Sequence, residues 1–331
     1  MSTIVDPFLR KRVIMQSRRP LGLALALASA ASFALSGIFA AALLDGGWSA
    51  GAVTLVRIGG GALVLLAPTL WLLRGRWDAV LRSWREVLVL GVLAVAVCQL
   101  AFFTAVAFID PSLALLIEFL GPVLLVFFTW ATTRRAPAVL TLAGAAVALL
   151  GLALVSGIGG DALHPLGVLL ALGAAVGNAG YWASASKADS ELPPIALAGL
   201  GLMVGALVLG IASATGLLPF AATAEPVVLA GSTVPWWAAM GMLILIATAA
   251  SYVLGILGAR RLGATLASFV GYAEPMFGIL WTALLLAILP TGTQWLGAAA
   301  IIAGVVLVRL GQARRPRPTK GPAIVEGIPS P

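Results

Sequence analysis

Three ionisable residues, Arg57, Glu118 and Glu274, interrupt long apolar segments of this sequence. A charged side chain near the centre of a bilayer costs about 2.5–3.5 kcal/mol on insertion scales, so such residues usually face a partner or a water-filled path. A guanidinium group binds a carboxylate, and a carboxylate binds an ammonium group or exchanges a proton. The three residues are therefore candidates for substrate binding or ion coupling.

Arg57 and Glu118 are expected at a similar depth, each about four residues outward from the middle of its segment, at a rise of about 1.5 Å per residue. They could form an ion pair. This ion pair would be a permanent structural contact, or it would form only in the absence of substrate. In the second case an amino acid would replace it, with its carboxylate on Arg57 and its ammonium group on Glu118. Glu118 could instead exchange protons with the outside. Glu274, near the middle of its segment, is either a coupling residue or a protonated carboxyl group bonded to a neighbouring helix.

Two prolines follow the glutamates in these segments, Pro122 and Pro275. A proline inside a helix removes one backbone N–H and frees the carbonyl four residues earlier, here those of Glu118 and Gly271. We expect a helix kink at each proline, either beside a cavity or as a purely structural feature. Asn178 is the fourth candidate site residue, although small and polar side chains also simply pack membrane helices.

The sequence lacks the residues that a metal site, a disulfide or the common enzymatic motifs require. The chain has one histidine, His164, and one cysteine, Cys98, so neither a histidine-rich metal site nor an internal disulfide is expected. No phosphate-binding G-x-x-x-x-G-K, H-E-x-x-H or G-x-S-x-G motif occurs. We therefore expect no metal, no cofactor and no enzymatic activity.

The elements that carry these residues are membrane helices. The 331 residues are 61% hydrophobic and only 10% charged, whereas soluble domains contain about 25% charged residues. The apolar stretches, such as residues 87–93, are unbroken rather than alternating, which favours helices over a β-barrel. The composition therefore predicts an all-α integral membrane protein.

A membrane helix needs about 20 apolar residues, and the sequence predicts ten such spans. They are residues 20–44, 49–73, 86–108, 111–133, 137–158, 164–186, 193–215, 236–259, 263–288 and 293–312. Residues 216–235 are expected to form a loop. Tryptophans at the outer ends are expected at the membrane interface; these are Trp48, Trp236, Trp237 and Trp295.

The basic residues orient the spans. All but one of the 20 Lys and Arg residues fall in the N-terminal, C-terminal and alternate connecting segments or, as Arg309 does, at the end of the last span next to the C-terminal segment, and the exception is Arg57. Basic residues are retained in the cytoplasm, so both termini are predicted to be cytoplasmic. The net charge of +8 thus indicates topology and contact with anionic lipids rather than nucleic-acid binding.

An internal repeat divides the chain. Shifting it by 153 residues superposes 112–155 on 265–308 without a gap, matching Pro122 to Pro275, Gly144 to Gly297 and Gly151 to Gly304. A weaker match at a shift of 145 aligns residues 21–22 with 166–167. Because five spans per half is an odd number, the halves must be inverted relative to each other, as in many transporters. The predicted divisions are a cytoplasmic tail (1–19), two five-helix repeats (20–158 and 159–312) and a disordered cytoplasmic tail (313–331).

The sequence resembles the EamA-type drug/metabolite transporter superfamily. The resemblance covers nearly the whole chain and rests on the 5+5 repeat, Leu55-Val56-Arg57, and the run from Tyr272-Ala273-Glu274-Pro275 through Gln294-Trp295-Leu296-Gly297. The run from Ile117 to Pro122 and the pair Arg134-Arg135 are similar to the threonine/homoserine exporter branch. One departure is Ala287-Ile288, where the family often has Gly-Glu.

The resemblance implies a secondary transporter that exports small metabolites, amino acids such as threonine or homoserine, by alternating access driven by a proton gradient. The alternative is an exporter of drugs or other amphipathic metabolites, and less expected are a polytopic membrane enzyme or a sensor. The expected partners are a small-molecule substrate and the lipid bilayer, with no nucleic acid. The expected state is a monomer or homodimer in the inner (plasma) membrane, which the chain crosses several times.

Overall fold

The computed structural model describes residues 7–109, 111–156, 164–187 and 189–313. Within these ranges nine helices are long and apolar enough to cross a membrane, and the helix over Val139–Val155 is apolar but shorter. Nine of the ten predicted spans therefore correspond to a helix that is long enough to cross a membrane. The shorter helix lies in the predicted span 137–158 and ends where the described residues end.

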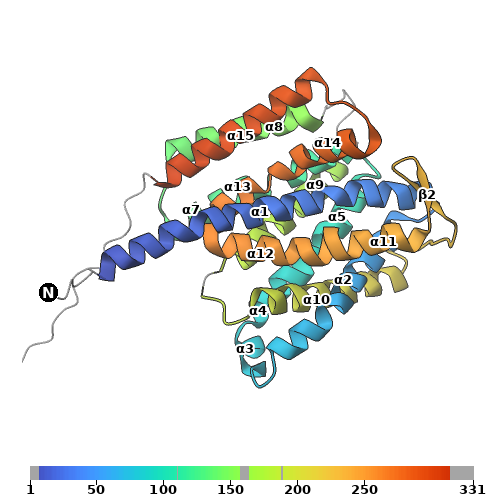
Figure 1. Cartoon of the computed structure of the whole chain (residues 1–331), viewed down its shortest axis with the longest axis horizontal. Coiled ribbons are helices and arrows are strands. Elements are labelled where there is room, and N and C mark those ends of the chain that lie inside the picture. Colours follow the sequence, from blue (N-terminus) through green and yellow to red (C-terminus); the bar gives the residue numbers. More distant parts are fainter. Residues whose placement is uncertain (1–6, 110, 157–163, 188, 314–331) are drawn as a thin grey trace, which may run out of the picture.

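The helices of the first half pack mainly against helices of the second half, as α2 does against α10 (Pro194–Ala214) and α8 against α15 (Gly292–Ala313) (Figure 1). The first half forms the following elements. They are α1 (Pro7–Asp45), α2 (Ala50–Leu72), α3 (Trp77–Arg82), α4 (Trp84–Leu88), the π-helix η1 (Val89–Val97), α5 (Cys98–Ala105), α6 (Pro111–Glu118), α7 (Gly121–Thr133) and α8 (Val139–Ser156). Helix α1 starts well before the predicted first span, because residues 7–19, expected as a tail, continue the same helix through Pro20. The predicted C-terminal tail, apart from Ala313, lies outside the described residues.

The second half adds the remaining helices and one hairpin. They are α9 (Pro165–Ala185), α10 (Pro194–Ala214), β1 (Val227–Leu229), β2 (Ser232–Val234), α11 (Trp236–Ile244), the π-helix η2 (Leu245–Ala250), α12 (Ser251–Leu262), α13 (Ala264–Val270), α14 (Ala273–Leu286) and α15 (Gly292–Ala313). Helix α1 begins and α15 ends at the same end of the bundle (Figure 1).

The connection between α10 and α11 is more ordered than the predicted loop. Strands β1 and β2 pair antiparallel, with Val227 opposite Val234, so the protein is not purely helical. The Ser49 hydroxyl donates to the Pro219 carbonyl and accepts from the Ala221 amide, both at 2.9 Å. Trp48 is buried here instead of lying at the membrane interface, because this folded connection packs over it.

Positions that the repeat relates have similar local structure in the two halves. The π-helices η1 and η2 both end where an α-helix begins, at Cys98 and at Ser251, which are 153 residues apart. The Cys98 thiol lies 3.4 Å from the carbonyl of Ala174, and the Ser29 hydroxyl donates to the carbonyl of Ser251 at 2.8 Å. The 145-residue shift relates Ser29 to Ala174, so these contacts are counterparts, which supports the repeat inferred from sequence.

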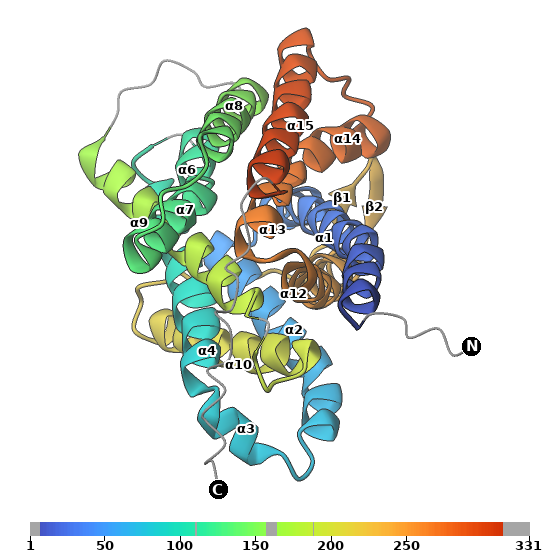
Figure 2. The same ribbon diagram turned by 90° about the vertical axis from the view of Figure 1, so that its left-hand side faces the viewer.

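Helices α8 and α15 pack against each other along glycines at one edge of the bundle (Figure 2). A Cβ atom at Gly144 would lie 2.6 Å from the Gly304 carbonyl oxygen, and one at Gly151 would lie 2.6 Å from that of Gly297. Residue numbers rise along one helix as they fall along the other, so the two helices are antiparallel. This is the arrangement that inverted halves require, and only glycine allows such close backbone approach.

Two ion pairs join α3 and α4 to the chain that follows α9. Arg82 lies 2.6 Å from Glu191, and Lys187 lies 2.6 Å from Glu86. The hydrogen bonds and charge of this contact raise the pKa of the Arg82 guanidinium and lower the pKa of the Glu191 carboxyl group. Both groups are exposed, so solvent screens the pair.

Candidate functional site

The two spans that carry the candidate glutamates are broken at their middle. Glu118 is the last residue of α6, and α7 begins at Gly121. Glu274 lies in the first turn of α14, after α13 has ended at Val270. Each break leaves backbone groups outside regular helix, which membrane proteins tolerate where protein or a water-filled space surrounds them.

The prolines occupy the first turns of the second half-helices rather than helix interiors. Pro122 is the second residue of α7 and Pro275 the third of α14, positions where a missing N–H costs little. The predicted kinks are therefore two-residue turns between separate helices, closed by the bonds from the Leu120 amide to the Ile117 carbonyl and from the Tyr272 amide to the Phe269 carbonyl. The prediction of a free carbonyl at Gly271 is wrong, because this carbonyl accepts the Glu274 amide at 2.9 Å.

Arg57, Glu118 and Glu274 are brought together from α2, α6 and α14. The Arg57 guanidinium interacts electrostatically with both carboxylates, and the carboxylates interact with each other. All three side chains are half-buried. No ion pair within 4.0 Å links any two of them, so the contact considered between Arg57 and Glu118 is not formed. The Nε atom of Arg57 is buried and has no hydrogen-bond partner among the described residues.

Glu118 is held by two neighbours. The Cys98 thiol donates to its Oε1 at 3.5 Å, and the side chain of Asn178 on α9 interacts with its carboxyl group. Asn178 in turn accepts a hydrogen bond from the indole Nε1 of Trp182 at 3.0 Å. The structure therefore places the fourth predicted residue, Asn178, against Glu118. Cys98, which was not among the predicted site residues, is buried and bonded to Glu118.

Sequence reasoning missed the aromatic side chains beside this cluster. Tyr252 interacts electrostatically with Arg57, Glu118 and Glu274, and it packs edge-to-face on Tyr181 with ring centroids 5.6 Å apart. Tyr181 packs on Trp182 at 4.9 Å. The chain contains only three tyrosines, all inside spans, and this scarcity is the signal that would have singled them out.

The site is asymmetric although the surrounding helices repeat. The repeat counterpart of Glu118 is Gly271, and that of Glu274 is Gly121. A Cβ atom at Gly121 would lie 2.7 Å from Asn178 Oδ1, and one at Gly271 would lie 2.6 Å from Cζ2 of Trp182. The space next to each counterpart glycine is thus filled by a side chain of α9.

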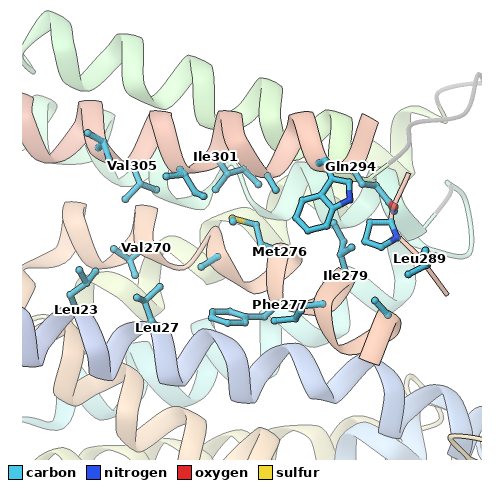
Figure 3. A pocket seen from close by; sticks show the side chains of 18 residues that line it. Leu23, Leu27, Val270, Met276, Phe277, Ile279, Leu289, Gln294, Ile301 and Val305 are labelled. Carbon is cyan, nitrogen blue, oxygen red and sulfur yellow. The ribbon is translucent and has the colours of Figure 1, made fainter. Parts of the chain in front are cut away.

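A separate apolar cavity of about 570 Å³ lies between α1, α14 and α15. Leu27 and Phe277 border it on one side and Ile301 and Val305 of α15 on the other, with Met276 between them (Figure 3). It reaches Val270 and Ala273, which flank the break before Glu274. Its wall is almost entirely hydrocarbon, apart from Gln294 and the indole of Trp295.

The described residues hold no group of three or more His, Cys, Asp or Glu side chains placed to bind a metal ion. The charges of the cluster are one guanidinium and two carboxylates, set among hydroxyl, thiol, amide and indole groups. This arrangement offers donors and acceptors for a small molecule that carries both signs of charge.

Comparisons with known proteins agree with this architecture. The sequence pattern of the EamA-like transporter family matches residues 20–157 and 165–310. A protein of Salmonella typhimurium, described as "Uncharacterized inner membrane transporter YicL", is 26% identical over 250 residues, which are 74% of this chain and 78% of that protein. A solved structure described only as "Crystal structure of protein" superposes with a TM-score of 0.70 over 88% of this chain and 97% of its own, at 20% identity, and so shares the fold.

Proposed function

This chain belongs to the EamA-like transporter family, and we propose that it exports small zwitterionic metabolites, namely amino acids such as threonine or homoserine. We propose that it does so by alternating access coupled to a proton gradient. That it is a multi-pass transporter of the inner membrane follows from the family, the relative and the nine long apolar helices. The class of substrate, the direction of transport and the driving ion are proposed in addition.

The unpartnered Nε of Arg57 is the observation that carries the proposal. A guanidinium N–H without a partner costs free energy when it is buried away from water. An arginine inside a membrane helix is retained when it has something to bind. The carboxylate of an amino acid would supply the missing acceptor in bidentate geometry.

The ammonium group of the substrate would bind Glu118. This carboxyl group is already oriented by Cys98 and Asn178, so little ordering remains to be done when the substrate arrives. The N-termini of α7 and α14 start at the two breaks, and their positive dipole ends would add to the attraction for the substrate carboxylate.

Glu274 would couple transport to protons. It makes no hydrogen bond or ion pair with any other side chain in the described part of the chain, yet it interacts with both Arg57 and Glu118. A proton that enters or leaves Glu274 would therefore change the electrostatic balance of the binding pair. The two inverted halves would provide the outward-open and inward-open states by exchanging roles.

The apolar cavity supports a second candidate, the export of amphipathic compounds or drugs. Its volume of about 570 Å³ lies within the range of small-molecule pockets, roughly 300–1,000 Å³. Its wall next to the α13–α14 break would accommodate a hydrocarbon group while a polar group reached Glu274. This candidate requires substrates that are more apolar than threonine.

Counterflow in proteoliposomes tests both candidates. Vesicles loaded with unlabelled amino acid should accumulate labelled L-threonine or L-homoserine without an ion gradient, and the Arg57→Lys variant should accumulate far less, because lysine cannot form the bidentate pair. Competition only by apolar cations and drug-like amines would favour the second candidate. Absence of counterflow with every zwitterion tested would exclude the first.

A further inference from the structure

The pair Asn178 and Trp182 occupies the two places where the internal symmetry of the site is broken. Asn178 lies against Gly121 and Trp182 against Gly271, and these glycines are the repeat counterparts of Glu274 and Glu118. One turn of α9 separates the two side chains, which brings them onto the same face of the helix. Substitution of either glycine by a larger residue would displace one member of the pair.

The direction of the hydrogen bond between them decides how Asn178 faces Glu118. A side-chain amide has one acceptor end and one donor end, and its neighbours determine which end points where. The indole of Trp182 can only donate, and it donates to Oδ1 of Asn178 at 3.0 Å. The NH2 group of Asn178 is the end that this bond leaves free, and the Asn178 side chain interacts with the carboxyl group of Glu118.

We propose that Trp182 is a positioning residue of the transport site, which fixes the Asn178 amide so that its NH2 group holds the Glu118 carboxylate in place for a substrate ammonium group. The role assigned to Glu118 rests on the proposed function, whereas the chain of contacts from Trp182 through Asn178 to Glu118 does not. Without the indole N–H the amide can rotate, and Glu118 then loses a donor and its fixed orientation.

Cys98 reports on this arrangement without any substrate. It is the only cysteine of the chain, and its thiol donates to Glu118. The thiol has a second acceptor, the Ala174 carbonyl at 3.4 Å. A Glu118 side chain released by Trp182→Phe would leave the thiol with this acceptor alone and would no longer cover it, so methyl methanethiosulfonate should label Cys98 faster in purified, reconstituted protein. Asn178→Ala should have the same effect, and the double variant should label no faster than Asn178→Ala alone, because the two residues act in series.

The matched control is Trp281→Phe. The indole of Trp281 also donates one hydrogen bond, to the carbonyl of Ala31 at 2.8 Å, but it does not contact Glu118. Its loss should leave Cys98 labelling unchanged.

Gly271→Ala is a second way to displace Trp182 from Asn178, because the added methyl group would collide with the Trp182 ring. This change should speed labelling in the parent protein and have no further effect in the Trp182→Phe background.

Transport supplies the functional readout. In counterflow with L-threonine, Trp182→Phe should raise KM roughly tenfold, the effect of one oriented hydrogen bond, with a smaller change in maximal rate. Additive labelling effects of Trp182→Phe and Asn178→Ala, or parental labelling in Trp182→Phe, would overturn the positioning role. If the parent protein exchanges none of the zwitterions tested, the proposed function fails, and the labelling series still decides the role of Trp182.

Discussion

The hydroxyl of Tyr272 donates a hydrogen bond to the backbone carbonyl of Phe119 at 2.6 Å, across 153 residues of sequence. This separation equals the repeat shift, so the two residues are counterparts of each other. Phe119 lies in the break between α6 and α7, and Tyr272 in the break between α13 and α14. Their rings also pack edge-to-face, with centroids 5.7 Å apart. The two broken spans therefore meet at equivalent positions, which is where a two-fold axis would pass.

This contact should stabilise the protein measurably. Tyr272→Phe leaves the Phe119 carbonyl buried without its hydroxyl partner, which costs about 1–3 kcal/mol, so the midpoint of thermal unfolding in detergent should fall. Tyr181→Phe is the matched control, because the Tyr181 hydroxyl is buried without a partner among the described residues. Its removal should leave the midpoint unchanged or raise it. An equal fall in both variants would mean that the hydroxyl of Tyr272 contributes nothing specific.

The glycine contact between α8 and α15 should tolerate no side chain. Gly151→Leu would force a side chain into the backbone of α15, since even a Cβ atom there lies 2.6 Å from the Gly297 carbonyl oxygen. We expect a severe loss of folded protein, measured as monodisperse yield in size-exclusion chromatography. Gly210→Leu is the control, because a Cβ atom at Gly210 meets nothing within 4 Å. A normal yield for Gly151→Leu would show that the two helices can separate freely.

The positions of the basic residues predict that both termini are cytoplasmic. In a Cys98→Ala background, Val228→Cys in the β-hairpin should react with an impermeant maleimide added to intact cells, because this residue is 64% exposed on the predicted outer side. Leu81→Cys in α3, 72% exposed, should react only after the membrane is permeabilised. The reverse pattern of labelling would invert the topology.

The ion pair of Arg82 with Glu191 predicts a dependence of stability on pH. Because the pKa of Glu191 is lower in the folded protein, its carboxylate stabilises the fold above the unfolded pKa of about 4.3. This contribution disappears as pH falls through the folded pKa. Glu191→Gln should therefore lower the unfolding midpoint slightly at pH 7 and not at all at the acid end. High salt should also reduce the difference. Glu225→Gln, at an exposed carboxylate without an ion pair in the described structure, should show no such trend.

Much of this fold was predicted from the lengths of the apolar segments and the positions of proline and glycine. These features determine local structure, so they can be read from a short stretch of sequence. Pro122 and Pro275 marked the two broken spans, and the glycines that the repeat matched lie at the α8–α15 contact. Rotation of each helix about its own axis is decided by long-range packing, so depth alone placed Arg57 beside Glu118 and missed its interaction with Glu274. The bond from Cys98 to Glu118 was equally hidden, because it depends on which helices are neighbours.

Glu118 is expected to be the carboxylate that transport cannot lose. Glu118→Gln keeps the shape of the side chain and an oxygen that accepts from Asn178, but it removes the negative charge that would bind an ammonium group stripped of water. The variant should fold and insert normally, yet both gradient-driven export and counterflow should be abolished. Proteoliposomes with and without an imposed pH gradient separate the two activities.

Glu274→Gln provides the comparison at the second carboxylate with which Arg57 interacts. If Glu274 only couples transport to protons, this variant should lose driven export and keep counterflow, which needs no gradient. Glu225→Gln is the control, because Glu225 lies in the connection between α10 and α11 and outside the cluster of Arg57, Glu118 and Glu274. It should retain both activities. If Glu118→Gln transports normally while Glu274→Gln loses counterflow, the ammonium group binds at the α13–α14 break, and the roles of the two carboxylates are exchanged.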